Sequence, residues 1–228
     1  MNEPVDSARD FLRVTEIFHS VQGESTWAGL PCTFVRLTGC PLRCTWCDTG
    51  YAFHGGERMT LDDIVARVDE IGTRVVEITG GEPLIHRSAF ILVTRLLDLR
   101  YTVLVETSGA IDVAPLDARA HRIMDLKCPD SGESARNLWS NLDHLTHRDE
   151  IKFVVASRTD YEWAREVIRE RHLDVKVAAG ELRALLMSPV WESMDFRQLA
   201  DWILEDRLPV RYQIQLHKII WGANVPGV

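Results

Sequence analysis

Short runs of β-branched and apolar residues alternate with amphipathic runs along most of this chain, and this alternation restricts the possible fold more than any other feature. The apolar runs are typical of strands, whereas the amphipathic runs repeat apolar residues at helical spacing. We predict strands over 33–38, 74–79, 101–107, 123–127, 151–155, 184–188 and 211–216. We predict helices over 61–71, 89–99, 136–146, 160–171 and 194–205, the first capped by Thr60 and the second by Ser88.

Strand–helix alternation with apolar strands favours parallel βαβ units, with helices outside the sheet. Six or seven strands fall short of a full eightfold (β/α) barrel, which typically needs about 250 residues. The sequence therefore predicts an α/β fold, namely an open partial (β/α) barrel of about six parallel strands with extensions. We expect a single domain over 1–228, with a mobile tail at 1–12 and a functional loop at 39–59, and we assign no element to 173–184.

The charge and hydropathy of the chain exclude several classes of partner. The net charge is −8, from 26 Lys+Arg against 34 Asp+Glu, and affinity for nucleic acid comes largely from basic residues that neutralise phosphates. The first dozen residues lack the basic start and apolar run of a secretory signal. No run approaches the roughly 20 apolar residues that cross a bilayer. We therefore expect a cytoplasmic protein that binds neither nucleic acid nor membrane.

Three of the five cysteines, Cys40, Cys44 and Cys47, fall within eight residues. In a reducing compartment, clustered thiols are typical of a metal site rather than of disulfides. A structural zinc ion normally takes four protein ligands, so zinc would need a fourth group such as His54. Three thiolates suit a [4Fe–4S] cluster that keeps one iron free to bind a substrate or cofactor. Both metal assignments stay open on the cysteines alone.

The order of two motifs resembles the radical S-adenosylmethionine (SAM) superfamily. The spacing C-x-x-x-C-x-x-C follows the first predicted strand, and Thr79–Pro83 (TGGEP) follows the second. The resemblance implies that the open iron chelates SAM, whose reductive cleavage gives methionine and a 5′-deoxyadenosyl radical. Gly80 and Gly81 lack a Cβ, which lets the backbone approach a ligand closely. Ser108, after the third predicted strand, is a weaker candidate for a SAM contact.

A longer series of motifs is similar to the 7-carboxy-7-deazaguanine synthase family, which serves 7-deazapurine (queuosine precursor) biosynthesis. The segments are FHSVQGE (18–24), TFVRLTGCPLRCTWCDT (33–49), ITGGEP (78–83), ETSG (106–109) and QLHKIIWG (215–222). The resemblance implies a carbon–nitrogen lyase that acts on 6-carboxy-5,6,7,8-tetrahydropterin. Abstraction of the C6 hydrogen starts a ring contraction that loses ammonia. The family also implies Mg²⁺, a homodimer and a flavodoxin-like electron donor.

The family's site residues carry over by motif. The residues that the resemblance implies for SAM are Trp46, Cys47, Asp48, Gly81, Ser108, Asp125, Leu126, Lys127 and Ser188. Those that it implies for the substrate are Val21, Gln22, Gly23, Glu24, Arg36, Thr79 and Val228, and Thr49 matches the Mg²⁺ ligand. Arg36 also stands out by itself, because a charge inside an apolar strand should be paired or functional. A guanidinium suits a substrate carboxylate.

Several assignments stay open. His217 is equally well a site residue or a core histidine, and we expect Cys32 and Cys128 to be small buried hydrophobes. A glycyl-radical enzyme activase shares the short chain and the cysteine loop, but it must dock a large protein partner. A non-enzymatic zinc or iron–sulfur binding module is the second alternative. The VQGE segment, Arg36 and the CDT segment favour a small carboxylated heterocycle as the substrate.

Overall fold

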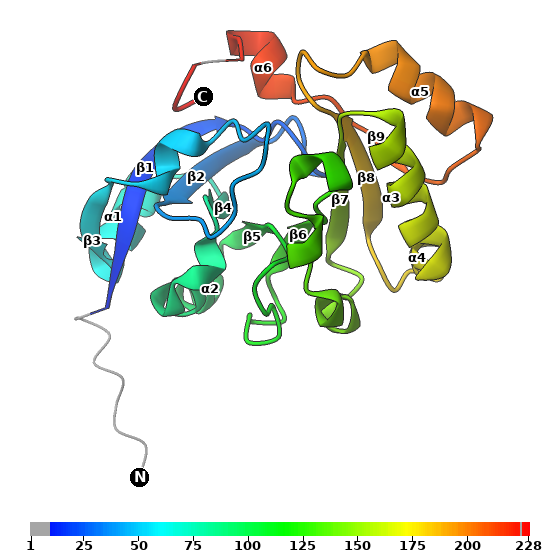
Figure 1. Ribbon diagram of the computed structural model, residues 1–228. Coiled ribbons are helices and arrows are strands. Elements are labelled where there is room, and N and C mark those ends of the chain that lie inside the picture. Colours follow the sequence, from blue (N-terminus) through cyan, green and yellow to red (C-terminus); the bar gives the residue numbers. More distant parts are fainter. Residues whose placement is uncertain (1–9, 224) are drawn as a thin grey trace.

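The computed structural model describes residues 10–223 and 225–228, in which the chain forms nine strands and six α-helices (Figure 1). The strands are β1 (Phe11–Val21), β2 (Pro31–Leu37), β3 (Glu57–Thr60), β4 (Val75–Gly80), β5 (Thr102–Thr107), β6 (His121–Asp125), β7 (Glu150–Val155), β8 (Ala184–Pro189) and β9 (Arg211–Tyr212). The α-helices are α1 (Leu61–Ile71), α2 (Arg87–Asp98), α3 (Arg158–Glu170), α4 (Leu173–Ala178), α5 (Phe196–Glu205) and α6 (Leu216–Trp221).

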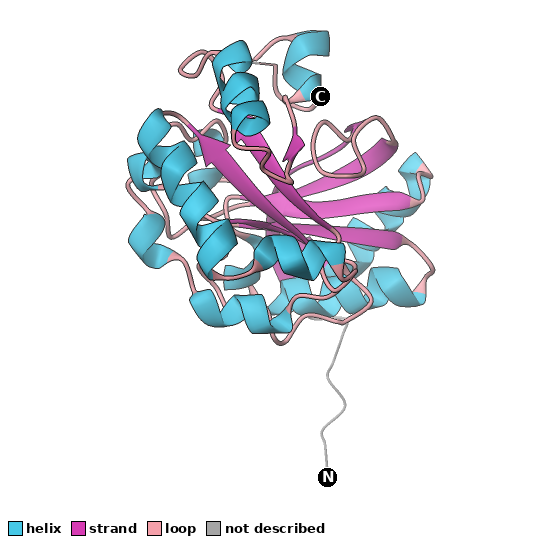
Figure 2. Cartoon of the chain, turned by 90° about the vertical axis from the view of Figure 1, so that its right-hand side faces the viewer, coloured by secondary structure: helices cyan, strands magenta, loops and turns pink. Residues whose placement is uncertain are grey.

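All nine strands belong to one sheet, in the order β3-β1-β2-β4-β5-β6-β7-β8-β9. The strands β2 and β4 to β9 pair in parallel, whereas β1 is antiparallel to both β2 and β3. Within the described residues the edge strands β3 and β9 do not pair with each other, so the barrel stays open. Figure 2 shows helices covering one side of the fanned strands. The prediction of an open partial barrel is confirmed.

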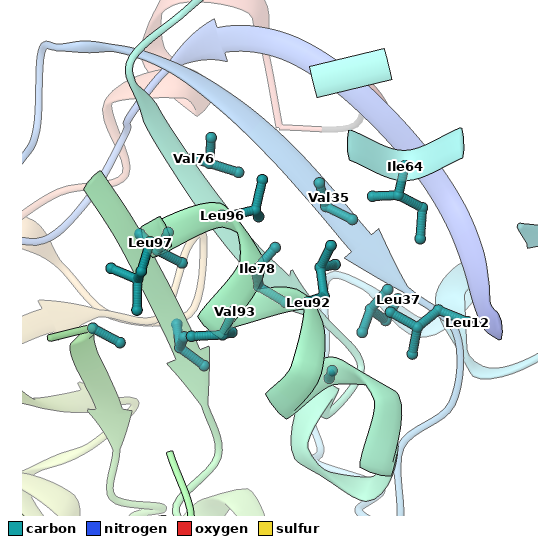
Figure 3. Packing of buried hydrophobic residues seen from close by; sticks show 14 of the residues in the cluster. Leu12, Val35, Leu37, Ile64, Val76, Ile78, Leu92, Val93, Leu96 and Leu97 are labelled. Atoms are coloured by element: carbon teal, nitrogen blue, oxygen red, sulfur yellow. The ribbon is translucent and has the colours of Figure 1, made fainter. Parts of the chain in front are cut away.

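Two apolar cores lie between the sheet and the helices. One joins α1 and α2 to the first strands, where Ile78 of β4 packs near Leu92 and Leu96 of α2 (Figure 3). The other joins α3 and α5 to β7 and β8 around Phe153 and Tyr161. Both cores use the side chains that face the helices, which leaves the opposite, concave face of the sheet available for polar groups.

The predicted cap of α1 is confirmed. The Thr60 hydroxyl accepts a hydrogen bond from the backbone of Asp63 at 3.1 Å, and the Asp63 carboxylate accepts one from the Thr60 backbone at 3.4 Å. This reciprocal pair is a capping box. The predicted cap of α2 is wrong, because that helix begins at Arg87 and the Ser88 hydroxyl donates to Asp10 instead.

The predicted parallel strands up to β8 are confirmed to within two residues, but the two antiparallel strands were not predicted. In β1 a register shift between Val14 and Glu16 interrupts the alternation that marks a half-buried strand. Of the predicted tail, residues 1–9 lie outside the described residues. Phe11 and Leu12 belong to β1, and Leu12 is buried in the core, so the tail prediction is wrong there. The predicted loop 39–59 likewise ends in β3.

The helix predicted over 136–146 is wrong, because this stretch forms two 3₁₀ segments, Ser134–Arg136 and Trp139–His144. The amide of Asn141 explains the difference. It donates to the carbonyls of Gly109 and Ile111, at 3.1 and 2.8 Å, and so holds this segment by tertiary contacts. Such contacts override local helical spacing.

The last predicted strand, 211–216, is correct only for Arg211 and Tyr212. Beyond them, the Gln213 side chain accepts from the Ser25 backbone at 2.9 Å, and Leu216 starts the unpredicted helix α6. Part of the unassigned stretch 173–184 is helix α4. None of the helices in the described part of the chain is long and apolar enough to cross a membrane.

The buried pair of Arg122 and Asp149 links β6 to the turn before β7, with Nη1 3.0 Å from Oδ2 and both side chains almost fully buried. We expect Arg122→Met to lower the free energy of unfolding by about 3–5 kcal/mol, because the Asp149 charge stays buried without its partner. Urea unfolding of the protein measures this loss. The exposed pair of Arg67 and Glu70 is the control, and Arg67→Met should cost less than about 1 kcal/mol. Equal losses in the two variants would contradict the expectation.

Candidate active site

A row of polar side chains crosses the concave face of the sheet near the carboxyl ends of the parallel strands. Register and contacts connect its members from strand to strand: Arg36, Thr79, Glu106, Asp125 and Lys152. Ser188 of β8 lies opposite Val154, two residues beyond Lys152. The carboxyl ends of parallel strands are where open α/β folds bind ligands. We call this row the polar wall.

The segment that follows β1 crosses the open side of the barrel to the last strands. The amide of Gln22 donates to Glu77 of β4, while Thr26 donates to Glu150 of β7 from its backbone at 3.0 Å. Ser25 pairs with Gln213, beyond β9. Because these contacts span strands from β4 to β9, this segment brings Val21, Gln22, Gly23 and Glu24 against the polar wall.

Gly23 lies directly against His217 of α6. A Cβ at this position would fall 2.2 Å from Nδ1 of the imidazole, so no other residue fits without moving the His217 side chain. The Gly23 carbonyl also accepts from the Leu216 backbone at 3.0 Å. His217 is therefore adjacent to the predicted substrate segment, and α6 rather than a strand carries it there. Burial lowers the pKa of His217, which favours the neutral imidazole.

The cysteine loop is held on several sides. Its Thr45 backbone donates to the Ser131 carbonyl at 3.0 Å, and the Arg43 backbone donates to the Glu133 carboxylate at 2.6 Å. On another side, Asp48 forms an ion pair with Lys218 of α6 at 2.7 Å. These contacts fix the loop between the segment after β6 and α6. Cys40 and Cys44 are half-buried and Cys47 is exposed.

The TGGEP segment packs against the cysteine loop at Gly81. A Cβ on Gly81 would fall 2.3 Å from the Gly39 carbonyl oxygen and 2.7 Å from Cβ of Cys40, so this close approach requires glycine. The next residue, Glu82, is fully buried, and its backbone donates to the Gly39 carbonyl at 2.8 Å. The two residues therefore dock the end of β4 onto the first cysteine.

Glu82 was missed by the sequence analysis, although it lies inside the motif. Its carboxylate accepts hydrogen bonds from the hydroxyls of Thr107 and Ser108 and from the Ser108 backbone. This group therefore joins TGGEP to ETSG. The Ser108 hydroxyl already donates a hydrogen bond to Glu82. The side chain of Ser108 therefore supports the Glu82 carboxylate.

The three thiols fit a cluster better than a single metal ion. Burial raises the pKa of each thiol, that of Cys44 to about 11, while nearby Lys127 lowers all three. The thiols therefore keep their protons at neutral pH until a metal displaces them. No three His, Cys, Asp or Glu side chains among the described residues converge on one metal ion, and His54 is exposed. A zinc ion about 2.3 Å from each sulfur requires such convergence, whereas each thiolate of a cluster can bind a different iron.

Two residues predicted to bind SAM each carry a buried polar atom without a partner in the described part of the chain. These atoms are Oδ1 of Asp125 and Oγ of Ser188. Buried polar atoms are normally hydrogen-bonded, so each of these two atoms leaves a hydrogen-bonding position open to a ligand. Oδ2 of Asp125, by contrast, lies 2.9 Å from Nζ of Lys127. The residues on this side of the wall therefore fit a polar ligand such as SAM.

The other predicted SAM positions are spread around the cysteine loop. Trp46 is half-buried and Asp48 is paired with α6, whereas Leu126 is fully buried and can offer only its backbone. Cys32 and Cys128 are buried, as predicted, and both lie outside the cysteine loop.

Arg36 of β2 is held by two residues that the sequence analysis missed. Its Nε donates to Oε1 of Glu16 at 2.7 Å, and the Tyr51 hydroxyl donates to the same oxygen at 2.7 Å. Phe18 and Tyr51 also lie beside the guanidinium, with ring centroids 5.7 and 5.9 Å from Cζ. Because Glu16 takes the Nε edge, the two Nη groups form the edge that remains for bidentate binding of a carboxylate.

The remaining predicted substrate residues lie on the same side. Thr79 donates to Glu106 at 3.2 Å. The side chain of Gln22 is buried, and its carbonyl oxygen accepts from the Glu24 backbone at 2.8 Å. Its backbone is bonded as well, since it donates to the Leu30 carbonyl and accepts from Gly29, both at 2.8 Å. Val228 follows Gly227, where a Cβ would lie 3.8 Å from the Glu16 carboxylate, so the chain end approaches Arg36.

Comparisons with known proteins identify relatives along nearly the whole chain. The model of the radical SAM superfamily matches residues 34–170. A 7-carboxy-7-deazaguanine synthase of Koribacter versatilis is 43% identical over 95% of this chain and 100% of the relative. A second, of Chlorobaculum tepidum, is 44% identical over 95% of this chain and 97% of the relative. A crystal structure of QueE from Escherichia coli shares the fold, with a TM-score of 0.70, 24% identity and coverage of 91% and 95% of the two chains.

We expect Cys40→Ala, Cys44→Ala and Cys47→Ala each to lose the cluster and turnover, because these three thiols share one loop. Cys32→Ala should keep both, since Cys32 is buried in β2. Iron and sulfide analysis after anaerobic reconstitution measures the outcome. A full complement of iron in Cys44→Ala would contradict the assignment.

We expect Arg36→Met to weaken binding of a carboxylated substrate while slow, uncoupled cleavage of SAM continues. The loss is about 3–5 kcal/mol if the guanidinium is the buried partner of the substrate carboxylate. Glu16→Gln keeps the guanidinium but removes the charge that orients it, so it should weaken binding less. Equilibrium binding of the pterin checks both, with Arg58→Met, whose guanidinium stacks 3.8 Å from the Phe11 ring, as the control. An unchanged pterin affinity in Arg36→Met would mean that another group holds the carboxylate.

Proposed function

Because this chain belongs to the radical SAM superfamily and, within it, to the 7-carboxy-7-deazaguanine synthases, we propose that it converts 6-carboxy-5,6,7,8-tetrahydropterin into 7-carboxy-7-deazaguanine with loss of ammonia. The enzyme is then a carbon–nitrogen lyase of 7-deazapurine biosynthesis. The observation that carries the proposal is the 43–44% identity to named synthases over 95% of the chain. The continuous nine-stranded sheet supports a single radical SAM domain.

Cys40, Cys44 and Cys47 would hold a [4Fe–4S] cluster, with SAM beside it. When bound, the cluster and SAM supply the radical that removes a hydrogen from the substrate. The protein binds, orients and shields the reactants. The residues that we assign to SAM are Trp46, Cys47, Asp48, Gly81, Ser108, Asp125, Leu126, Lys127 and Ser188. The unpartnered buried atoms of Asp125 and Ser188 support this side of the site most directly.

The substrate would lie between the segment after β1 and the polar wall. The Nη edge of Arg36, which no described residue occupies, suits the pterin carboxylate, and Glu24 is an acceptor for the N–H edge of the ring. Val21, Gln22 and Gly23 would line the same side of the substrate, and Thr79 and Val228 complete the set. Thr79 and Arg36 are neighbours across the β2–β4 pair, which supports a common ligand for them.

We assign Mg²⁺ to Thr49. This residue precedes a 3₁₀ turn at Gly50–Phe53, but its hydroxyl does not cap that turn. The hydroxyl instead donates to Asp48 at 2.9 Å, which leaves lone pairs of the oxygen for a cation. Mg²⁺ keeps several waters and often takes further ligands from the substrate, here the pterin carboxylate. A homodimer and a flavodoxin-like electron donor belong to the proposal through the family.

Product analysis tests the function directly. The reconstituted protein is incubated anaerobically with SAM, a reductant, Mg²⁺ and the pterin, and the products are identified by mass spectrometry. We expect 7-carboxy-7-deazaguanine and ammonia. A glycyl-radical activase would leave the pterin unchanged, and a zinc module would be colourless and leave SAM intact.

We expect Mg²⁺ to raise turnover much more than it raises cluster content or SAM binding, since it orients the substrate. Misplacement of a reactant by about 1 Å can lower the rate on the order of a hundredfold. Thr49→Val keeps the shape but removes the ligand oxygen, so it should lose most of this stimulation. Turnover is measured against Mg²⁺ concentration for both proteins, and equal stimulation would refute the ligand role.

A further inference from the structure

Lys152 of β7 is the most heavily paired charge of the polar wall, although no motif singled it out. Its side chain is only 5% exposed. Nζ lies 2.8 Å from Oε2 of Glu24 and 3.8 Å from Oδ2 of Asp125, and it also donates to Oε1 of Glu106. These carboxylates come from the segment after β1, from β6 and from β5. One ammonium therefore joins three segments that are distant in the sequence.

Each of the three carboxylates has one further partner in the site. Glu24 accepts from the Gln215 amide at 2.8 Å, and Glu106 accepts from the Thr79 hydroxyl at 3.2 Å. Asp125 has its own cation, Lys127, at 2.9 Å. Asp125 therefore keeps a directly paired cation without Lys152, whereas Glu24 and Glu106 form no other ion pair with the described residues. Lys152 thus matters most for the two carboxylates on the substrate side.

We propose that Lys152 is a positioning residue, which fixes the carboxylates of Glu24 and Glu106 where the substrate meets them and aligns that side of the site with the SAM side at Asp125. The inference rests on the proposed function. Lys152 does not need to touch the substrate, because both carboxylates lie between it and their other site partners. A purely structural ion pair would need one carboxylate, and here the ammonium has three.

The charge state of the wall agrees with this role. Burial alone would lower the pKa of Lys152, but Glu106, Glu24 and Asp125 raise it well above its ordinary value, so the ammonium persists. Burial would likewise raise the pKa of Glu24, yet Lys152 and Gln215 bring it below the ordinary value. At Glu77 the balance is the opposite, because burial together with Glu106 and Glu24 outweighs Lys152 and Arg36 and raises the pKa well above its ordinary value. Without Lys152, the other carboxyls would face each other in the same way, and like charges at close range do not both stay ionised.

Lys152→Met tests the proposal, because methionine has a similar length without the charge. We expect the affinity for the pterin, measured by equilibrium binding, to fall about tenfold or more, since a buried charge pair loses one partner. SAM binding should change by less than about threefold, because Asp125 keeps Lys127. More 5′-deoxyadenosine should form for each 7-carboxy-7-deazaguanine, as the substrate is misaligned. Pterin affinity and coupling equal to those of the unmodified protein would overturn the proposal.

Two further variants separate positioning from general stability. Arg122→Met also removes a buried cation from a buried carboxylate, but it lies outside the polar wall, so it should lose stability and keep the pterin affinity. An equal loss of pterin affinity in Arg122→Met would overturn the proposal. Lys152→Arg keeps the charge and should fold if Lys152→Met does not. Its planar fork shifts the carboxylates, so an intermediate loss of pterin affinity is expected, and no loss would count against the proposal.

Two measurements on the unmodified protein distinguish a failure of the proposed function from a failure of the role proposed for Lys152. If it makes no 7-carboxy-7-deazaguanine and does not bind the pterin, the proposed function fails. If it does both while the Lys152 variants behave like it, only the role of Lys152 fails.

Discussion

The ion pairs of Lys152 with Glu24 and Glu106 are the interaction on which the site depends, because they let a buried wall of carboxylates exist at all. An isolated buried charge costs several kcal/mol or more, so carboxylates on the concave face need cations within reach. The two helix-facing cores pack the helices on the sheet through apolar side chains, which need no counter-charge. The opposite face can therefore be polar, provided that its charges are matched. Lys152, which pairs with Glu24 and Glu106, and Lys127, which pairs with Asp125, supply that match.

The cysteine loop depends on a different kind of constraint, namely close backbone approach. Gly81 lets the end of β4 touch Gly39 and Cys40, and the buried Glu82 carboxylate fixes the same turn to Ser108. A loop that binds a cluster by only three thiolates has no fourth thiolate to anchor it. Its position must come from the protein, here from β4, from the segment after β6 and from α6. The same contacts place the loop beside the polar wall.

The parts of the molecule that sequence reasoning predicted are those encoded locally. The parallel strands β2 and β4 to β8, the capped helix α1 and the spacing of the three cysteines each reflect neighbouring residues, and the structure confirms these strands and this helix. The parts that were missed depend on distant contacts. Glu16 belongs to the site because it accepts a hydrogen bond from Arg36. Lys152 belongs to it because it pairs with Glu24, which is 128 residues away in the sequence. Lysine inside an apolar strand was a usable signal, of the same kind that identified Arg36. A register shift hid β1, and side-chain contacts to a remote loop replaced the predicted final strand.

Helix α6 shows why the two ends of the described chain must meet before the site is complete. Gln215, which precedes this helix, donates to Glu24 at 2.8 Å and to Asp48 at 3.3 Å, and Lys218 pairs with the same aspartate. The segment after β1 and the cysteine loop therefore share one support, which comes from α6 and the residue before it. Gly23 packs directly against this support, so the order of the segments in space is fixed by sterics as well as by charge. The contact of Gln215 with Glu24 joins residues 191 positions apart, so it belongs to the non-local contacts that slow folding. The open barrel thus supplies the wall, and the C-terminal segment sets the distance between the groups that a substrate and a cluster would use.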